Sequence, residues 1–314
     1  MTISKPRLEL LKFILMLDQP SLHDFLYEFL IDYYKEEEIW EFDGNYLYAE
    51  GDINVCVVAH LDTVHRSQPK SDEIIYDADQ YVLWSPVGIG GDDRCGVFII
   101  LNLIMHGYKP HVLFTWNEET GGYGAKAAAS HIHPKLDFMI QFDRRGSGQS
   151  VYYDLDHLEF ETYINSFGFD TQWGTYTDIC ELAPEWKCAA VNLSAGYERE
   201  HTSSETIYLK VLNDTLLKAA KILDAYRIEP RAFEYKEKIS YSKASSSDTE
   251  YVWNIATSSS KKNDSWDSYP CYGCSKVYKW SNLNEMGLCD ACEDYRLNKK
   301  PSFYNKLSRG TFSV

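Results

Sequence analysis

Short apolar runs alternate with amphipathic stretches along most of the chain. Near the N-terminus, apolar residues recur at helical spacing, at Leu22, Phe25, Leu26 and Phe29, which predicts amphipathic helices in the first 40 residues. Further on, strands are expected at residues 55–59, 112–116, 136–142 and 188–193, and helices at residues 97–105, 123–130 and 207–226. This alternation predicts an α/β fold with a mixed, mostly parallel sheet flanked by helices.

The composition changes after this body. Residues 240–265 are rich in serine and poor in aliphatic side chains, which is typical of a linker. Two closely spaced pairs of cysteines follow it. We therefore expect a catalytic body at residues 1–238, a linker at 239–268, a small cysteine module at 269–296 and a tail at 297–314.

The charge balance narrows the classes of partner. The chain has 31 Lys and Arg against 47 Asp and Glu, a formal net charge of −16, and 44% of its residues are hydrophobic. The hydrophobic content is enough for a sizeable core. The negative net charge disfavours a protein whose main function is to bind nucleic acid or an anionic membrane. Residues 13–17 are apolar but too short for a membrane span, and no small-residue cleavage site follows them. We expect a cytoplasmic protein that does not act at membranes.

The eight cysteines form two populations. Cys56, Cys95, Cys180 and Cys188 stand singly among apolar neighbours, where a cysteine usually behaves as a small hydrophobic residue. The other four form two C-x2-C pairs with 14 residues between them, at Cys271, Cys274, Cys289 and Cys292. In a cytosolic chain this spacing predicts a structural zinc site, because four thiolates complete a tetrahedron and leave no open position. A small module of this kind is called a zinc ribbon. The sequence leaves open whether this zinc ribbon binds nucleic acid, protein or nothing.

Acidic and histidine side chains follow nearly every predicted strand of the body. They are His60 and Asp62, Glu118 and Glu119, and Asp143; Asp92 and Asp93 open a helix after glycines, and His201 lies in a loop. Imidazole and carboxylate are the ligands that an open, catalytic zinc site uses. Several crowded carboxylates would repel one another without cations between them. The simplest arrangement is two metal ions bridged by one carboxylate.

Each of these residues also has an ordinary structural role to consider. A histidine at a strand end can be a hydrogen-bonded core residue, Asp92 and Asp93 can cap a helix, and two adjacent glutamates can be solvated surface. Taken singly, the structural role is favoured for each of them. Their ordered recurrence at strand ends, among glycines that let the backbone approach a ligand, favours a shared site.

The motifs also resemble a family. They are "AHLDTV", "GGDDRCGV", "NEETGGYGA", "QFDRRG" and "NLSAGYEREHTSSE", in this order between residues 55 and 208. They look like the successive motifs of the co-catalytic zinc exopeptidases, which include peptidase T, carboxypeptidase G, acetylornithine deacetylase and related aminopeptidases. The resemblance implies that His60 and Asp143 hold one zinc, that Glu119 and His201 hold the other, and that Asp92 bridges them. It further implies that Glu118 is the general base and that Asp62 orients His60.

The chain departs from part of this family. Peptidase T and its close relatives insert a lid or dimerisation domain between the positions of Asp143 and His201. The stretch from residue 144 to residue 200 is too short for such a domain plus the rest of the sheet. We therefore expect a lid-less body. "GTYTDICELAPEWKCAAVNLSAG" resembles the threonine-aspartate segment before the last ligand, with a helix cap at Thr177 and Asp178 as the alternative.

These features predict a metal-dependent hydrolase that cleaves a peptide or small amide bond, most simply an aminopeptidase-like exopeptidase. Glu118 would take a proton from water activated by two zinc ions, for which cobalt or manganese can substitute. Tyr197, Tyr123 and Arg144 are candidate oxyanion donors among which the sequence does not choose. An N-acyl amino acid deacylase with the same site is the alternative substrate class, and a binding module on a retired peptidase fold is the alternative outside catalysis. The sequence leaves the oligomeric state open.

Overall fold

The computed structural model describes residues 3–237, except 43, 154 and 156, together with the backbone of two short strands further on. These strands, β13 (Ser268–Pro270) and β14 (Val277–Lys279), pair with one another in antiparallel fashion. The ribbon cysteines Cys271, Cys274, Cys289 and Cys292 lie outside the described residues, as does most of the expected linker. The predicted four-cysteine module therefore stays a prediction.

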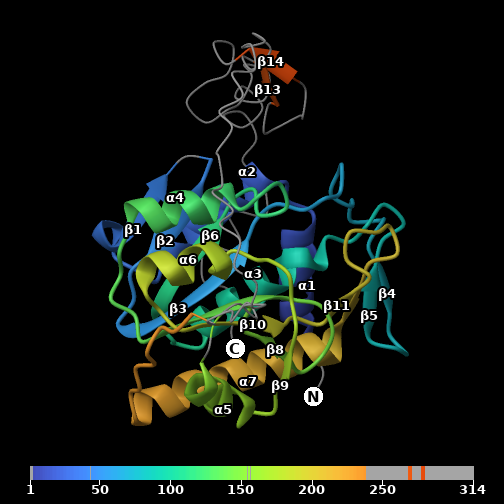
Figure 1. Ribbon diagram of the computed structural model, residues 1–314. Helices are drawn as coiled ribbons and strands as arrows, with labels where there is room; N and C mark the ends of the chain where they lie inside the picture. The colour runs from blue at the N-terminus through green and yellow to red at the C-terminus, as the bar shows by residue number, and fades with distance from the viewer. Residues whose placement is uncertain are drawn as a thin grey trace, which may run out of the picture.

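A mixed sheet of eight strands forms the centre of the body, in the order β1-β2-β6-β3-β7-β10-β8-β9 (Figure 1). The strands are β1 (Ile39–Phe42), β2 (Tyr46–Ala49), β3 (Ile53–His60), β6 (Pro110–Thr115), β7 (Phe138–Arg144), β8 (Gln149–Val151), β9 (Asp170–Gln172) and β10 (Ala190–Ser194). The central strands β6, β3, β7 and β10 run parallel, whereas β2 and β8 join them in antiparallel fashion. The predicted mixed, mostly parallel sheet is confirmed.

Helices cover both faces of this sheet. The larger core contains side chains of α1 (Lys5–Leu15), α2 (Gln19–Leu30), α3 (Gly91–Met105), α5 (Leu158–Asn165) and α7 (Leu209–Ile228). The second core lies under α4 (Tyr123–His131) and α6 (Ile179–Trp186), which Figure 1 shows side by side. Successive side chains of a strand point to opposite faces, so Val57 packs in the first core and Val58 in the second. Burial on both faces explains why these strands are apolar throughout.

A second, smaller sheet was not predicted. It contains four antiparallel strands in the order β11-β12-β5-β4: β4 (Ile75–Asp77), β5 (Val82–Trp84), β11 (Tyr197–Glu198) and β12 (Thr206–Tyr208). The predicted helix at residues 207–226 was wrong at its start, because Ile207 pairs with Leu83 in this sheet and α7 begins only at Leu209. Ile207 is fully buried there. Every second side chain of a strand points to the same face, so a short strand is enough to bury Ile207.

The residues between Asp143 and His201 build no lid in the described part of the chain. They form β8, α5, β9, α6, β10 and β11, of which β8, β9 and β10 complete the main sheet. The expectation of a lid-less body agrees with this arrangement. Among the helices of the described residues, none is both long enough and apolar enough to cross a membrane.

Candidate metal centre

The candidate ligands converge at the carboxyl ends of three adjacent strands. β3 ends at His60, β7 carries Asp143 next to its last residue, and Glu118 and Glu119 follow β6 in the chain. Strands β6, β3 and β7 are parallel neighbours, so their carboxyl ends meet at the same edge of the sheet. This edge is where ligands bind in open α/β sheets.

Asp92 lies between the two histidines of the cluster. It belongs to the first turn of α3, and His201 belongs to the loop between β11 and β12. Oδ1 of Asp92 is 3.1 Å from Nε2 of His60, and Oδ2 is 3.2 Å from Nε2 of His201. One carboxylate thus faces both imidazoles with different oxygens, which is the arrangement of a ligand shared by two cations.

Each histidine has a further carboxylate of its own. Nε2 of His60 is 3.6 Å from Oδ1 of Asp143, and Nε2 of His201 is 2.9 Å from Oε1 of Glu119. Three overlapping groups have ligand atoms within 4.8 Å of one another: His60 with Glu118 and Glu119, His60 with Asp93 and Asp143, and Asp92 with Glu119 and His201. The structure therefore brings together all five residues that the motif resemblance named as ligands.

Asp93 has a structural role that its neighbour Asp92 lacks. Its Oδ1 accepts the backbone N–H of Gly96 at 2.9 Å, and its Oδ2 accepts the N–H of His60 at 3.3 Å. A Cβ at Gly96 would lie 2.4 Å from this Oδ1, so only glycine fits there. Of the two adjacent aspartates, Asp93 thus caps the helix and Asp92 points to the histidines.

Asp62 connects His60 with the glutamate loop. Its two oxygens accept the backbone N–H groups of Glu118 and Glu119, each at 3.0 Å. Oδ1 also lies 3.3 Å from Nδ1 of His60, on the side of the ring away from Asp92. The carboxylate therefore holds the segment that carries the predicted base and faces the imidazole that it was predicted to orient.

The Asp143 carboxylate is held by several donors. The hydroxyl of Tyr197 donates to Oδ1 at 3.0 Å, and the hydroxyl of Thr177 donates to Oδ2. Tyr197, one of the candidate oxyanion donors, is therefore buried with its hydroxyl on this carboxylate. Asp178 occupies the N-cap position directly before α6, but its side chain makes no capping hydrogen bond and instead accepts one from Thr115 at 2.5 Å. The alternative of a helix cap thus holds for the position of Asp178 and not for its side chain.

Without metal ions, several side chains of this cluster keep their protons to a higher pH than the same side chains do in water. Burial, with neighbouring carboxylates adding to it, raises the pKa of Glu118 to about 10, of Glu119 to about 7 and of Asp143 to about 6. The pKa of His60 is also raised, because the three aspartates around it outweigh the effect of burial. At neutral pH, several of these groups thus share protons that divalent cations could replace.

The residues present fit a pair of divalent cations. Two imidazoles and at least three carboxylates surround one small volume, and the bridging position is filled by a carboxylate. Oε1 of Glu119 is buried and lacks a hydrogen bond although Nε2 of His201 is 2.9 Å away, as expected for two ligands aimed at a common centre. The structure thus contains a candidate metal centre, and the chemical types of its ligands indicate which ion suits it.

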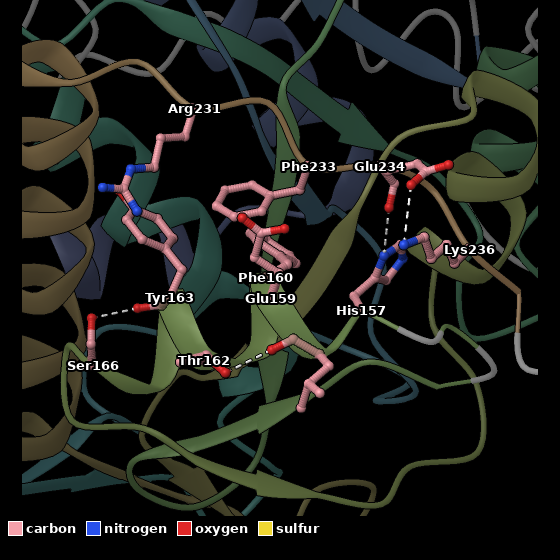
Figure 2. A pocket seen from close by; sticks show the side chains of 11 residues that line it. His157, Glu159, Phe160, Thr162, Tyr163, Ser166, Arg231, Phe233, Glu234 and Lys236 are labelled. Carbon is pink, nitrogen blue, oxygen red and sulfur yellow. Dashed lines mark hydrogen bonds and ion pairs between the residues drawn. The ribbon is translucent and has the colours of Figure 1, made fainter.

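A separate pocket of about 730 Å³ lies away from this centre, and Figure 2 shows its lining. It is formed by α5 and the segment after α7, with Phe160 and Phe233 in its floor and Arg231 over the ring of Tyr163 at 5.9 Å. None of the candidate ligands contributes to it. The candidate metal centre and this pocket are therefore two separate places in the fold.

Sequence reasoning missed one buried acid beside the centre. Glu205 is fully buried and bonds to the segment that carries Asp92. In the sequence it follows "HTSS" in a polar stretch, which looks like an ordinary surface loop. Its position, the last residue of the last family-like motif, was the available signal.

Comparisons with known proteins place the fold. No family model and no curated protein matches the sequence. Among solved structures, aminopeptidase PepT from Bacillus cereus matches with a TM-score of 0.58 and 14% identity, over 71% of this chain and 98% of that one. This chain shares the fold of that aminopeptidase. A tripeptidase from Staphylococcus aureus matches with a TM-score of 0.58 and 14% identity, over 72% of this chain and 99% of its own.

An aminopeptidase from the archaeon Desulfurococcus kamchatkensis shares this aminopeptidase fold at a TM-score of 0.53 and 16% identity, over 70% of this chain and 97% of its own. At such identities the likeness concerns the fold. It confirms, at that level, the resemblance to exopeptidases that the motifs predicted.

Proposed function

We propose that the protein is a metal-dependent aminopeptidase with two zinc ions. The observation that supports this most is the position of Asp92, whose two oxygens face His60 and His201 at 3.1 and 3.2 Å. One ion would be held by His60, Asp143 and Asp92, and the other by His201, Glu119 and Asp92. The likeness to aminopeptidases and a tripeptidase supports peptide-bond hydrolysis as the reaction.

Zinc is the metal that suits this set of ligands. Two histidines together with carboxylates are typical of catalytic zinc sites, and cobalt or manganese are the expected substitutes. Magnesium and calcium sites consist of oxygen ligands alone. When bound, the two ions would activate a water molecule and polarise the carbonyl of the scissile bond.

Glu118 is the proposed general base. Its N–H is anchored on Asp62, and its side chain lies in one group with His60 and Glu119. It would accept a proton from the attacking water and return it to the leaving amine. A fold kept only for binding would have no use for this carboxylate beside the ligands, so its presence favours an enzyme over a binding module.

The charge of the centre favours a substrate with a free amino group. Seven carboxylates gather there, those of Asp62, Asp92, Asp93, Glu118, Glu119, Asp143 and Asp178. Together they carry up to seven negative charges, whereas two divalent cations supply four positive ones and the buried Arg94 near Asp62 and Asp93 supplies one. The remaining field attracts the ammonium group of a peptide N-terminus and repels the carboxylate of an N-acyl amino acid. This supports an aminopeptidase over the deacylase.

A direct comparison of substrates tests this proposal. Short peptides with a free N-terminus and the same peptides N-acetylated would be incubated with the full chain and added zinc or cobalt, with Glu118→Gln as the control for contaminating peptidases. Release of the N-terminal residue from the free peptides alone is expected. Preferential cleavage of N-acyl amino acids would replace the aminopeptidase by a deacylase, and inertness of the metal-loaded protein toward every substrate would reject the enzyme.

The cysteines support two further proposals, one about a structural zinc ion and one about the location of the protein in the cell. We propose that Cys271, Cys274, Cys289 and Cys292 hold one structural zinc ion, on the strength of their spacing. Cys56, Cys95 and Cys188 are buried free thiols. Free thiols are usual where the surroundings are reducing, which supports a cytoplasmic location.

A further inference from the structure

Glu205 joins three segments that carry candidate ligands. Oε1 accepts the backbone N–H of Asp92 at 2.9 Å, and Oε2 accepts the N–H of Gly90, also at 2.9 Å. Nε2 of His65 lies 2.7 Å from Oε2 and completes the set. Glu205 itself stands four residues after His201, so one fully buried carboxylate ties the His201 loop to the start of α3 and to the loop after β3.

The packing around Glu205 leaves little freedom. A Cβ at Gly91 would lie 3.2 Å from Oε1 of Glu205 and 2.8 Å from Ile207, so this loop can approach only with glycine. The ring of His65 rests on Gly88, where a Cβ would come within 2.3 Å. The contacts are therefore specific to these residue types. They are also shielded from water, which makes loss of one partner costly.

We propose that Glu205 is a positioning residue that sets the place of Asp92 between the two ions. Fixing the Asp92 amide fixes its Cα, and the Asp92 carboxylate then reaches both His60 and His201. His65 supports Glu205 from the far side. This inference rests on the two-metal centre of the proposed function. It adds Glu205, which contacts the proposed ligand Asp92 through the backbone N–H of Asp92 and not through the Asp92 side chain.

The variant Glu205→Gln tests this role with little change in size. The amide keeps one acceptor oxygen but turns an NH₂ group toward one of the backbone donors, so one N–H loses its partner. Groups that orient metal ligands typically change metal affinity by about 10- to 100-fold when they are replaced. We expect Glu205→Gln to weaken binding at both positions by that factor, because both share Asp92.

Manganese is the probe, since Mn²⁺ suits carboxylate ligands, which are frequent in this centre, and is not selected by four soft thiolates. The full chain would be titrated with Mn²⁺ and followed by electron paramagnetic resonance, which counts free ions and detects the coupled signal of two ions with a shared ligand. Glu38→Gln is the matched control. It removes a carboxylate that accepts from Lys109 and from the backbone N–H of Lys35, far from the ligands in sequence.

The outcomes separate this inference from the proposed function. A wild-type protein that binds no pair of coupled Mn²⁺ ions would overturn the metal centre itself. A wild type that binds two ions, with Glu205→Gln equal to it, would overturn the role of Glu205 alone. Weakened binding in Glu205→Gln with an unchanged Glu38→Gln supports it. If Glu205→Gln fails to fold, His65→Phe, which keeps a ring but lacks the donor, decides the question by the same criterion.

Discussion

Oδ1 of Asp62 accepts the backbone N–H of Glu118 at 3.0 Å. This contact joins the end of β3 to the loop after β6, and the same carboxylate lies 3.3 Å from Nδ1 of His60. A single side chain thus holds the proposed base and faces a proposed ligand. Asp62 therefore fixes the backbone of Glu118 relative to His60.

We expect Asp62→Asn to lower the rate of hydrolysis by about 10- to 100-fold and to lower the affinity for the ion next to His60. The asparagine has one acceptor oxygen for two N–H donors, and it lacks the negative charge that faces the imidazole. Steady-state kinetics and metal content of the same preparations measure both effects. Wild-type values for both would show that Asp62 only packs against the loop.

Glu118→Gln and Glu119→Gln should differ although the residues are adjacent. Glu118→Gln cannot accept a proton and should keep both ions while losing about 10²–10⁴-fold in rate. Glu119→Gln should lose metal at the His201 position and regain activity in part with excess zinc or cobalt. Metal analysis and peptide hydrolysis are measured side by side. Metal loss in Glu118→Gln with retention in Glu119→Gln would mean that the two roles are reversed.

We expect three zinc ions per full chain and two after truncation behind residue 240. All candidate ligands of the body precede this point, and Glu237 still pairs with Leu155. Elemental analysis after mild zinc repletion counts the ions, and a chelator should abolish hydrolysis by the truncated body. If the full chain holds only one ion and the truncated body none, the catalytic centre is refuted.

His111 should make the fold less stable in mild acid. Burial lowers the pKa of this histidine to about 4, from an ordinary value of 6.5. As the pH falls below about 6.5 the unfolded chain binds the proton first, so stability decreases until about pH 4, where both states are protonated. The difference of pKa corresponds to about 3 kcal/mol over this interval.

Urea denaturation at about pH 7 and about pH 5 measures this effect as a difference between variants. His111→Gln should flatten the decrease, whereas His133→Gln, a change at an exposed histidine, should leave it as in the wild type. An equal decrease in all three proteins would assign the acid sensitivity to other groups.

The main sheet could be predicted because its strands are buried on both faces. The expected strand at residues 55–59 lies within β3 (Ile53–His60), since a continuous apolar run of that length is typical of a central parallel strand. The smaller sheet could not be predicted in the same way. Its strands have two or three residues, as in β4 (Ile75–Asp77), and so short a run shows no period.

Three of the candidate ligands could be predicted because they lie at strand ends or just after a strand, and Asp92 and His201 because they occur in recognisable motifs. Of the residues that support them, Asp62 could be predicted from its motif, whereas Glu205 and Asp178 could not. Glu205 is buried only because residues far away in the chain, Gly90 and Asp92, bring their N–H groups to it. Likewise, Asp178 looks like a helix cap in sequence but bonds to Thr115 of a distant strand. Such contacts depend on the tertiary fold and leave no local pattern.

The two histidines differ greatly in their access to water: the side chain of His60 is 1% exposed and that of His201 is 52% exposed. On the proposed assignment, an ion at His60 sits in the floor of the centre, whereas an ion at His201 sits at its rim, on a loop. The rim ion would exchange with the medium much faster than the floor ion. Dilution or dialysis would then yield a half-loaded protein, and the supply of free metal would set the rate of hydrolysis through the rim position alone.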